Sequence, residues 1–297
     1  MPPAAVAAAT DASRADQLFT RFQQYLPTRF LSWLVFKLSR LQLPAFKSLL
    51  IRMFMQQYRI RLDEAVHDKP GDYASFNDFF TRALKPHARP IDVHPKSIAS
   101  PVDGTVSQAG QLTEGRIFQA KGHDYSLVDL LGGDPALALP FTGGTFATIY
   151  LAPHNYHRIH MPISGTLKKW IYVPGRLFSV NPATVRAMPG VFAKNERVVS
   201  LFETDAGPFA LIMVGALFVG SMETTWGGLV TPPHKRNAPV DVYEPYSTTT
   251  LGKGFEMGRF NMGSTVILLH KPGRVTWSPA LVPGAQLRVG QAIGMWK

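Results

Sequence analysis

The segment GRFNMGSTVILLH, residues 258–270, joins a glycine-containing turn to an apolar run. Gly263 and Ser264 stand directly before the run Thr265–His270. A short apolar run entered through glycine is typical of a buried strand, and it predicts a chain built largely from strands. A serine after a glycine is common in such places, so Ser264 alone has an ordinary structural interpretation.

Similar short apolar runs, most of them bounded by glycine and proline, fill the chain from about Ile91 onward. This pattern of short apolar runs predicts many short strands in an antiparallel or barrel-like core. Asp103-Gly104 predicts a tight turn, and Thr231–Thr250 is the longest irregular stretch, either a mobile loop at a site or a plain connector. The other predicted strands are Phe146–Leu151, Gly165–Val173, Val198–Phe202 and Phe209–Val219.

The residues before Ile91 have the pattern of helices instead. Ser13 can cap a helix, with Asp16 three residues further on. A second capping pattern at 75–78 opens a short helix, predicted over Phe76–Leu84. The chain is therefore predicted to be an α+β protein, with a helical region that precedes a β-rich core.

Two of these helices carry a wide apolar face edged with cations. One lies between Pro27 and Pro44 and the other is Phe46–Tyr58. Such helices are expected to lie in a membrane interface, and the alternative is that they pack on the core of the domain. The polar stripe of the first helix is Arg29, Ser32, Lys37 and Arg40. We predict a membrane-association region at 1–90 and a catalytic core at 91–297.

Composition excludes several kinds of chemistry. The 297 residues include no cysteine, which excludes disulfides, thiolate zinc sites and cysteine nucleophiles. The formal net charge of +11 points to an anionic partner, and nucleic acid and an anionic membrane surface both fit that charge. Nucleic acid is disfavoured because the basic residues are spread out and no recognition motif accompanies them. No stretch reaches the roughly 18 to 20 apolar residues of a spanning helix.

Three histidines fall at a spacing of three in PHNYHRIHMP, residues 153–162. Histidine is the side chain best suited to proton transfer near neutral pH, and it is also the commonest metal ligand. No further ligand motif of the familiar helical kind accompanies His154, His157 and His160, so we expect no metal. His154 is expected to be structural.

A serine becomes a nucleophile when a base takes its proton and a carboxylate holds that base. The chain offers Asp103, His160 and Ser264 for these roles. A serine hydrolase using these three residues is therefore one alternative, although Ser264 lacks the G-x-S-x-G setting of hydrolases. A non-catalytic basic protein that binds membranes or nucleic acid is another.

Nine short segments spread along the chain, including those around His157 and Ser264, together resemble the phosphatidylserine decarboxylase family from about residue 45 to the end of the chain. Any one match could be chance, but the ordered set is specific. The family's processing motif is usually Leu-Gly-Ser-Thr, and Met262, of similar size, replaces the leucine here with little expected effect. The matching segments are Phe76–Arg82, Ser100–Gly104, Tyr156–Pro162, Tyr172–Asn181, Asn195–Arg197, Val214–Ala216, Val219–Ser221, Gly258–Phe260 and Gly263–Ile267.

The resemblance implies a proenzyme that cuts itself between Gly263 and Ser264. The products would be a β chain, 1–263, and an α chain, 264–297, which stay together as a heterodimer. Ser264 would become a covalent pyruvoyl group, the cofactor. That group would form a Schiff base with phosphatidylserine and act as an electron sink while the lipid is decarboxylated to phosphatidylethanolamine.

The resemblance also implies roles for the other site residues. His160 would take the proton of Ser264, and Asp103 would orient His160. His157 would face the substrate during decarboxylation.

The family fold is a barrel-sandwich-like core with helices at the N-terminal end. The expected location is peripheral, on the cytoplasmic face of the bacterial inner membrane. The oligomeric state is left open, a homo-oligomer included.

Overall fold

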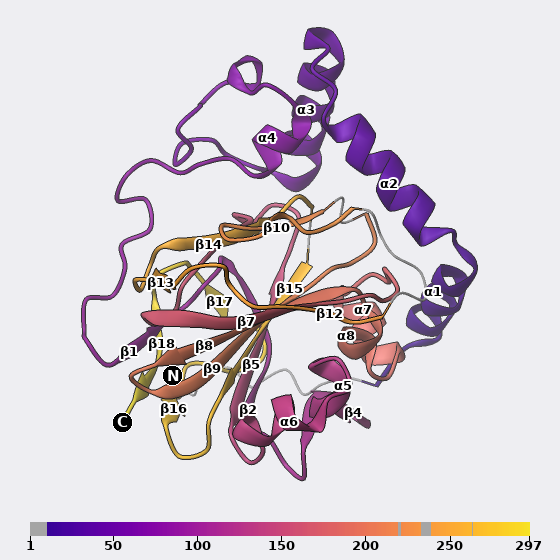
Figure 1. Cartoon of the computed structure of the whole chain (residues 1–297). Coiled ribbons are helices and arrows are strands. Elements are labelled where there is room, and N and C mark those ends of the chain that lie inside the picture. The colour runs from indigo at the N-terminus through magenta and orange to yellow at the C-terminus, as the bar shows by residue number, and fades with distance from the viewer. Residues whose placement is uncertain (1–10, 219–220, 233–238, 263) are drawn as a thin grey trace, which may run out of the picture.

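A computed structural model describes residues 11–218, 221–232, 239–262 and 264–297. Helices come first along the chain and strands dominate from Ser97 onward, which confirms the predicted order of helices and sheet-rich core. Figure 1 shows the first three helices running along the outside of the sheets. The four N-terminal helices are α1 (Arg14–Tyr25), α2 (Thr28–Ser39), α3 (Pro44–Tyr58) and α4 (Phe76–Phe80). A domain division at residue 90 stays a prediction.

Local sequence accounts for two helix starts. Ser13 and Asp16 form a reciprocal capping box at α1, with hydrogen bonds of 3.0 and 3.1 Å, so this prediction is confirmed. Ser75 accepts a hydrogen bond from the amide of Asp78 at the start of α4. The helix ends at Phe80, four residues earlier than predicted, and beyond it Leu84 forms a β-bridge with Ala65.

One large antiparallel sheet forms the centre of the molecule. Its strands follow the order β12-β7-β8-β9-β15-β5-β2-β17, and β13 also pairs with β7. Because the described sheet has edges at β12 and β17, it is not a closed barrel, and the barrel-like part of the prediction is wrong. The strands are β2 (Gly104–Gln111), β5 (Thr145–Leu151), β7 (Gly165–Val173), β8 (Arg197–Thr204), β9 (Gly207–Val214), β12 (Asp241–Tyr243), β13 (Thr249–Leu251), β15 (Ser264–His270) and β17 (Gln286–Leu287).

Smaller sheets and helices surround this one. A four-stranded sheet has the order β11-β10-β14-β6, a three-stranded sheet has the order β1-β18-β16, and β3 pairs with β4. In Figure 1, β14 and β10 lie between α3–α4 and the large sheet. The strands are β1 (Ser97–Ala99), β3 (Arg116–Ala120), β4 (His123–Ser126), β6 (Arg158–His160), β10 (Met222–Thr224), β11 (Gly228–Leu229), β14 (Glu256–Phe260), β16 (Val275–Trp277) and β18 (Ala292–Trp296). The short helices are α5 (Leu127–Leu130), α6 (Pro135–Ala138), α7 (Pro182–Ala187) and α8 (Val191–Lys194).

Two turn and loop predictions change. Asp103 and Gly104 do not close a hairpin, because β1 and β2 belong to different sheets. The stretch Thr231–Thr250 contains β12 and part of β13, so it is less irregular than expected; residues 233–238 lie outside the described part.

The strand β15 occupies the middle of the large sheet. It is hydrogen-bonded to β5 on one side and to β9 on the other, and all seven of its residues are buried. Its predecessor β14 belongs to the four-stranded sheet. The chain therefore leaves one sheet at Phe260 and enters the other at Ser264.

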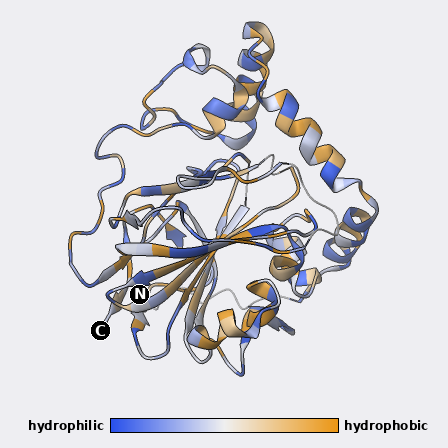
Figure 2. Ribbon diagram, viewed as in Figure 1, coloured by the Kyte–Doolittle hydropathy of each residue, from blue (hydrophilic) through white to orange (hydrophobic). Residues whose placement is uncertain are grey.

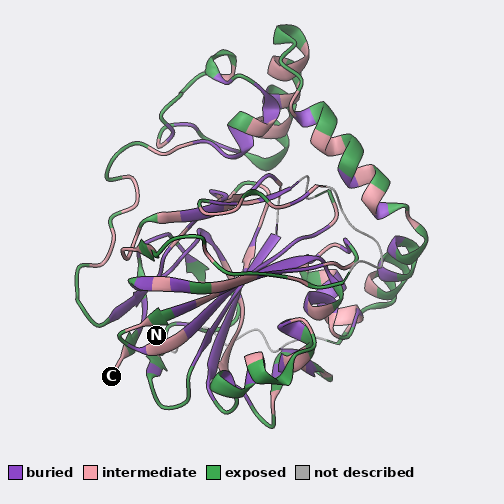
Figure 3. Cartoon of the chain, viewed as in Figure 1, coloured by how far each residue is buried: buried purple, intermediate pink, exposed green. Residues whose placement is uncertain are grey.

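The helices α1 and α2 have an inverted distribution of polar and apolar side chains. Their buried residues are all polar: Thr20, Gln23, Thr28, Ser32 and Ser39. Figure 2 shows hydrophobic residues along α2, and Figure 3 shows many residues of the same helix exposed. The exposed large apolar residues of α1–α3 and their connections are Leu18, Phe19, Phe22, Tyr25, Phe30, Trp33, Leu34, Leu38, Leu41, Leu43, Leu49, Met53 and Tyr58.

Three of the four residues of the polar stripe predicted on α2 face the protein, whereas Lys37 is exposed. Arg29 donates a hydrogen bond of 2.7 Å to the carbonyl of Gly175, and Arg40 donates one of 3.0 Å to the hydroxyl of Ser221. These two arginines therefore bind residues next to β7 and β10 and do not edge an apolar face as predicted. Within the described residues, no helix is both long and apolar enough to cross a membrane.

The approach of β10 to β14 leaves no room for a side chain at Gly258. A Cβ there would lie 2.5 Å from the carbonyl oxygen of Glu223, so Gly258→Ala should destabilise the fold by about 1–3 kcal/mol. Urea unfolding followed by tryptophan fluorescence measures the effect. The control is Gly110→Ala, whose Cβ would meet nothing closer than 3.8 Å. Equal midpoints for the two variants would contradict this account of the packing.

Candidate active site

Ser264 is the first residue of β15 and lies opposite Leu151 of β5. Its side chain is fully buried, and its Oγ has no hydrogen-bond partner in the described part of the chain. A buried hydroxyl without a partner costs about 1–3 kcal/mol, and a catalytic role is one explanation for such a group in a folded protein. The sequence-predicted nucleophile therefore carries a hydroxyl that no structural hydrogen bond occupies. Gly263, the other residue of the predicted cleavage site, lies outside the described residues.

The residues before the predicted cut are held from two sides. Asn261 donates a hydrogen bond of 2.6 Å to the Ser221 hydroxyl and accepts one of 3.0 Å from the Asn77 amide of α4. Met262 packs against the aromatic cluster of α3 and α4. Its φ of 132° is a backbone conformation that residues with side chains rarely adopt, at a typical cost of about 1–3 kcal/mol. Strain therefore lies one residue from the predicted scissile bond.

His157 is a buried, neutral imidazole with one free nitrogen. Its Nδ1 lies 2.8 Å from the carbonyl oxygen of Asn155, which makes Nδ1 the donor and leaves the lone pair on Nε2. Nε2 has no partner among the described residues. Burial lowers the pKa of His157 to about 3, and Phe80 covers the ring at 4.1 Å between centroids. This nitrogen can accept a proton or a hydrogen bond from a bound molecule.

His160 is partly buried at the end of β6, which begins directly after His157, and both of its ring nitrogens are engaged. Nδ1 lies 2.8 Å from the carbonyl oxygen of Gly254, so Nε2 accepts from the Tyr156 hydroxyl at 3.1 Å. Burial lowers the pKa of His160 and raises that of Tyr156 to about 12, so a neutral imidazole faces a protonated phenol.

Asp103 is buried in an ion pair with Arg89. Arg89 Nε lies 2.9 Å from Oδ1 and Nη2 lies 2.6 Å from Oδ2, while the Val289 amide donates to Oδ1 at 2.8 Å. Arg89 also donates to Glu64 at 2.8 Å. The sequence indicated neither Arg89 nor Tyr156 as a site residue, and both became visible through contacts with the predicted ones.

The structure brings the segment before β2 close to β6, because the His160 amide donates to the Pro101 carbonyl at 2.8 Å. Within the described residues, however, hydrogen bonds join neither Asp103 to His160 nor His160 to Ser264. His154 is exposed, and only its carbonyl is engaged, by Arg82. No group of three potential ligands is placed to hold a metal in this part of the chain. The predicted roles of these residues stay predictions.

Two spaces meet at Met262, two residues before Ser264. An inner cavity of about 380 Å³ is lined by Leu151, the partner of Ser264, and by Phe80, which covers His157. An apolar groove of about 450 Å³ runs between α2 and α3, lined by residues such as Val35, Leu38 and Leu50. The groove and the cavity share Phe54, Tyr58 and Met262. An apolar molecule between the helices could therefore reach the surroundings of Ser264.

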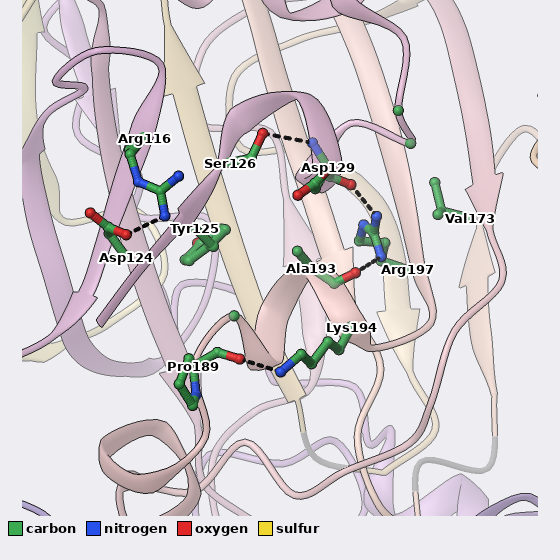
Figure 4. Close-up of a pocket in the computed structure, with 13 residues that line it drawn as sticks. Arg116, Asp124, Tyr125, Ser126, Asp129, Val173, Pro189, Ala193, Lys194 and Arg197 are labelled. Atoms are coloured by element: carbon green, nitrogen blue, oxygen red, sulfur yellow. Dashed lines mark hydrogen bonds and ion pairs between the residues drawn. The ribbon is translucent and has the colours of Figure 1, made fainter. Parts of the chain in front are cut away.

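A separate cavity of about 520 Å³ lies between the β3–β4 hairpin and α8 (Figure 4). Its cations are already engaged: Arg116 pairs with Asp124, Lys194 donates to the Pro189 carbonyl, and Arg197 donates to the carbonyls of Asp129 and Ala193. Because these cations already bind protein groups, we interpret this cavity as a structural feature and not as a ligand site.

Comparison with known proteins agrees with the resemblance seen in the sequence. The family model for phosphatidylserine decarboxylase matches residues 76–295, and a second model, described as PSD, matches residues 18–59. Three similar proteins, each called phosphatidylserine decarboxylase proenzyme, are 50% identical to the chain and cover 94% of it. They come from Bordetella avium, Nitrosococcus oceani and Pseudomonas fluorescens, and the matches cover 95%, 91% and 97% of their own lengths. The chain belongs to the phosphatidylserine decarboxylase family.

Proposed function

We propose that this chain is made as a proenzyme, converts its own Ser264 into a pyruvoyl group, and then decarboxylates phosphatidylserine to phosphatidylethanolamine. The observation that carries the proposal is the buried, unbonded hydroxyl of Ser264, at the motif where the resemblance implies the cut. The names of the similar proteins supply the substrate and the proenzyme state.

Self-cleavage would begin when the Ser264 hydroxyl attacks the carbonyl carbon of residue 263. The peptide bond becomes an ester, and β-elimination releases 1–263 with a carboxylate end and leaves dehydroalanine at 264. Its imine tautomer would then take up water and release ammonia, which gives the pyruvoyl group. The unusual φ of Met262 supports this step, because strain in the ground state lowers the barrier to a reaction that relieves it. By resemblance, His160 is the base and Asp103 orients it. Both would have to exchange their present partners, Tyr156 and Arg89, during the reaction.

A pyruvoyl group fits at position 264 because the hydroxyl is unpartnered and an inner cavity adjoins its strand partner Leu151. When present, the group supplies an electron sink for the loss of carbon dioxide. The free Nε2 of His157 can hold a hydrogen bond or a proton beside the substrate, in line with the role that the resemblance implies. Leu151, Phe80 and Met262 give this cavity apolar walls.

The pairing of the strands supports a stable complex of the two fragments. Within 264–297, β15 pairs with β5 and β9, β17 pairs with β2, and β18 pairs with β1. Each of these partners belongs to 1–263. A cut between two sheets would break none of these pairings.

The inverted helices support membrane association. Apolar side chains on α1 and α2 are exposed while polar ones bind the protein core, the opposite of an ordinary surface helix. A bilayer interface would bury these residues, and the net charge of +11 would favour anionic lipid. The apolar groove between α2 and α3 gives the acyl chains of the substrate a route to the inner cavity. We infer a peripheral location on the cytoplasmic face of the bacterial inner membrane.

Mass spectrometry of the purified protein tests self-processing. Wild-type protein should yield a fragment 264–297 with a blocked, amine-free end, whereas Ser264→Ala should stay a single chain and show no decarboxylation. Ser200→Ala is the matched control, because Ser200 is also fully buried in the large sheet with an unbonded Oγ, and it should cleave normally. A wild-type chain that stays whole, with esterase activity lost in Ser264→Ala, would favour a serine hydrolase instead.

Variants of the histidines test their separate roles. His160→Ala should block self-cleavage. His157→Ala should cleave at least in part but lose decarboxylation, by the ~10²–10⁴-fold that acid–base groups contribute. His123→Ala, in the separate β3–β4 hairpin, is the control and should keep both activities. Gel analysis and release of labelled carbon dioxide separate the two steps, and normal cleavage in both of the first two variants would refute the assignment.

Vesicle flotation tests the membrane face. Phe30, 58% exposed on α2, should contribute about 1.5–3 kcal/mol when buried in the interface, so Phe30→Asp should weaken binding to phosphatidylglycerol-containing vesicles by about 10–100-fold. Val93 is 92% exposed but lies outside the helices, so Val93→Asp should bind like the wild type. Equal binding by both variants would contradict a membrane role for α2.

A further inference from the structure

A third space beside the active site is strongly basic. This basic cavity, of about 350 Å³, shares Tyr58 with the inner cavity and the apolar groove. Five arginines line it against two carboxylates, those of Glu64 and Asp103, so the lining carries three excess positive charges. The arginines are Arg59, Arg61, Arg82, Arg89 and Arg288.

Three of these arginines already have carboxylate partners. Arg89 binds Asp103 and Glu64, Arg288 binds Glu64, and Arg61 binds Asp63. Arg82 has no carboxylate partner among the described residues, although it is only 7% exposed. Its Nη2 donates to the carbonyl of His154 at 3.1 Å, and its Nη1 has no partner in that part of the chain.

A buried guanidinium without an anion is unfavourable, because it has lost water without gaining a compensating charge. Burial lowers the pKa of Arg82, but an arginine side chain stays charged at neutral pH. An anion with two oxygens would match its planar donor fork and offset the lost hydration. Asp103 does not fill this role, because its oxygens are engaged by Arg89 and Val289.

Two segments that line the basic cavity are next in the chain to residues of the candidate active site. His154, Asn155 and Tyr156 line it, and His157 follows them directly. Phe80, two residues before Arg82, covers the ring of His157 and lines the inner cavity. A lipid with acyl chains in the apolar groove and its amino acid in the inner cavity would therefore have its headgroup beside Arg82.

We propose that the basic cavity binds the phosphodiester of the substrate headgroup, with Arg82 as its central ligand. This inference rests on the proposed function. The substrate's other anion, its carboxylate, is the group that leaves. A cation bound to the carboxylate would stabilise the ground state and oppose its loss. The phosphodiester keeps its charge throughout, so binding it positions the substrate without opposing the reaction.

Steady-state kinetics on processed enzyme, with soluble dihexanoyl phosphatidylserine, test the proposal. Arg82→Gln should raise KM by about 10–100-fold with kcat little changed, because the phosphodiester contact is the same in ground and transition states. Arg82→Lys should recover part of the loss. Arg116→Gln, an exposed arginine of the remote cavity in Figure 4, is the control and should match the wild type. A KM for Arg82→Gln equal to that of the control would overturn the proposal.

Inhibition of the wild-type enzyme gives a readout that does not depend on the folding of a variant. Dihexanoyl phosphatidylglycerol, which has the phosphodiester but no amine, should compete with the substrate, and dihexanoylglycerol, which lacks the phosphate, should not. Equal inhibition by both, or stronger inhibition by inorganic phosphate than by the phospholipid analogue, would overturn the proposal. Wild-type enzyme that did not turn over the substrate at all would instead refute the proposed function.

Discussion

The double pairing of β15 is the constraint on which the rest of the structure depends. β5 flanks this strand along its whole length and β9 flanks it from Thr265 onward, so Ser264 is held at the start of a central strand, opposite Leu151 of β5. Ser264 is fully buried, and its Oγ has no hydrogen-bond partner in the described part of the chain. The preceding residues must then cross from another sheet, which concentrates backbone strain at Met262. The burial of Ser264, the lack of a partner for its hydroxyl and the strain at Met262 are therefore all attributed to the way in which β15 is paired.

The helical region completes the site from the opposite side. The aromatic cluster of α3 and α4 holds Met262, and Phe80 of the same cluster covers His157. The same helices border the apolar groove and, at Tyr58, the basic cavity. The apolar groove and the inner cavity thus share side chains, so under the proposed function a lipid would pass from one to the other along apolar residues.

The sequence predicted the elements better than their surroundings. Strand runs such as Gly165–Val173 coincide with β7, because alternation and glycine boundaries are local signals. The direction in which α2 faces was not predictable, since periodicity identifies a polar stripe without showing whether Arg29 and Arg40 meet water or protein. Likewise, Asp103 was identified as a candidate but its partner Arg89 was not, because nothing in the sequence showed which cation the fold would place against that carboxylate. The open edges at β12 and β17 also depend on pairing between distant strands.

The strained backbone of Met262 also affects the direction of the proposed reaction. In the intact chain, Met262 lies between β14, which ends at Phe260, and β15, which begins at Ser264 in another sheet, so the residue has little freedom to relax. Once the bond after residue 263 is cut, the new chain end is tied on one side only, and Met262 can move to an ordinary conformation. Re-forming the peptide bond would require Met262 to return to its strained conformation, at the same cost in free energy. The relief of strain at Met262 would therefore favour the cut chain over the intact chain.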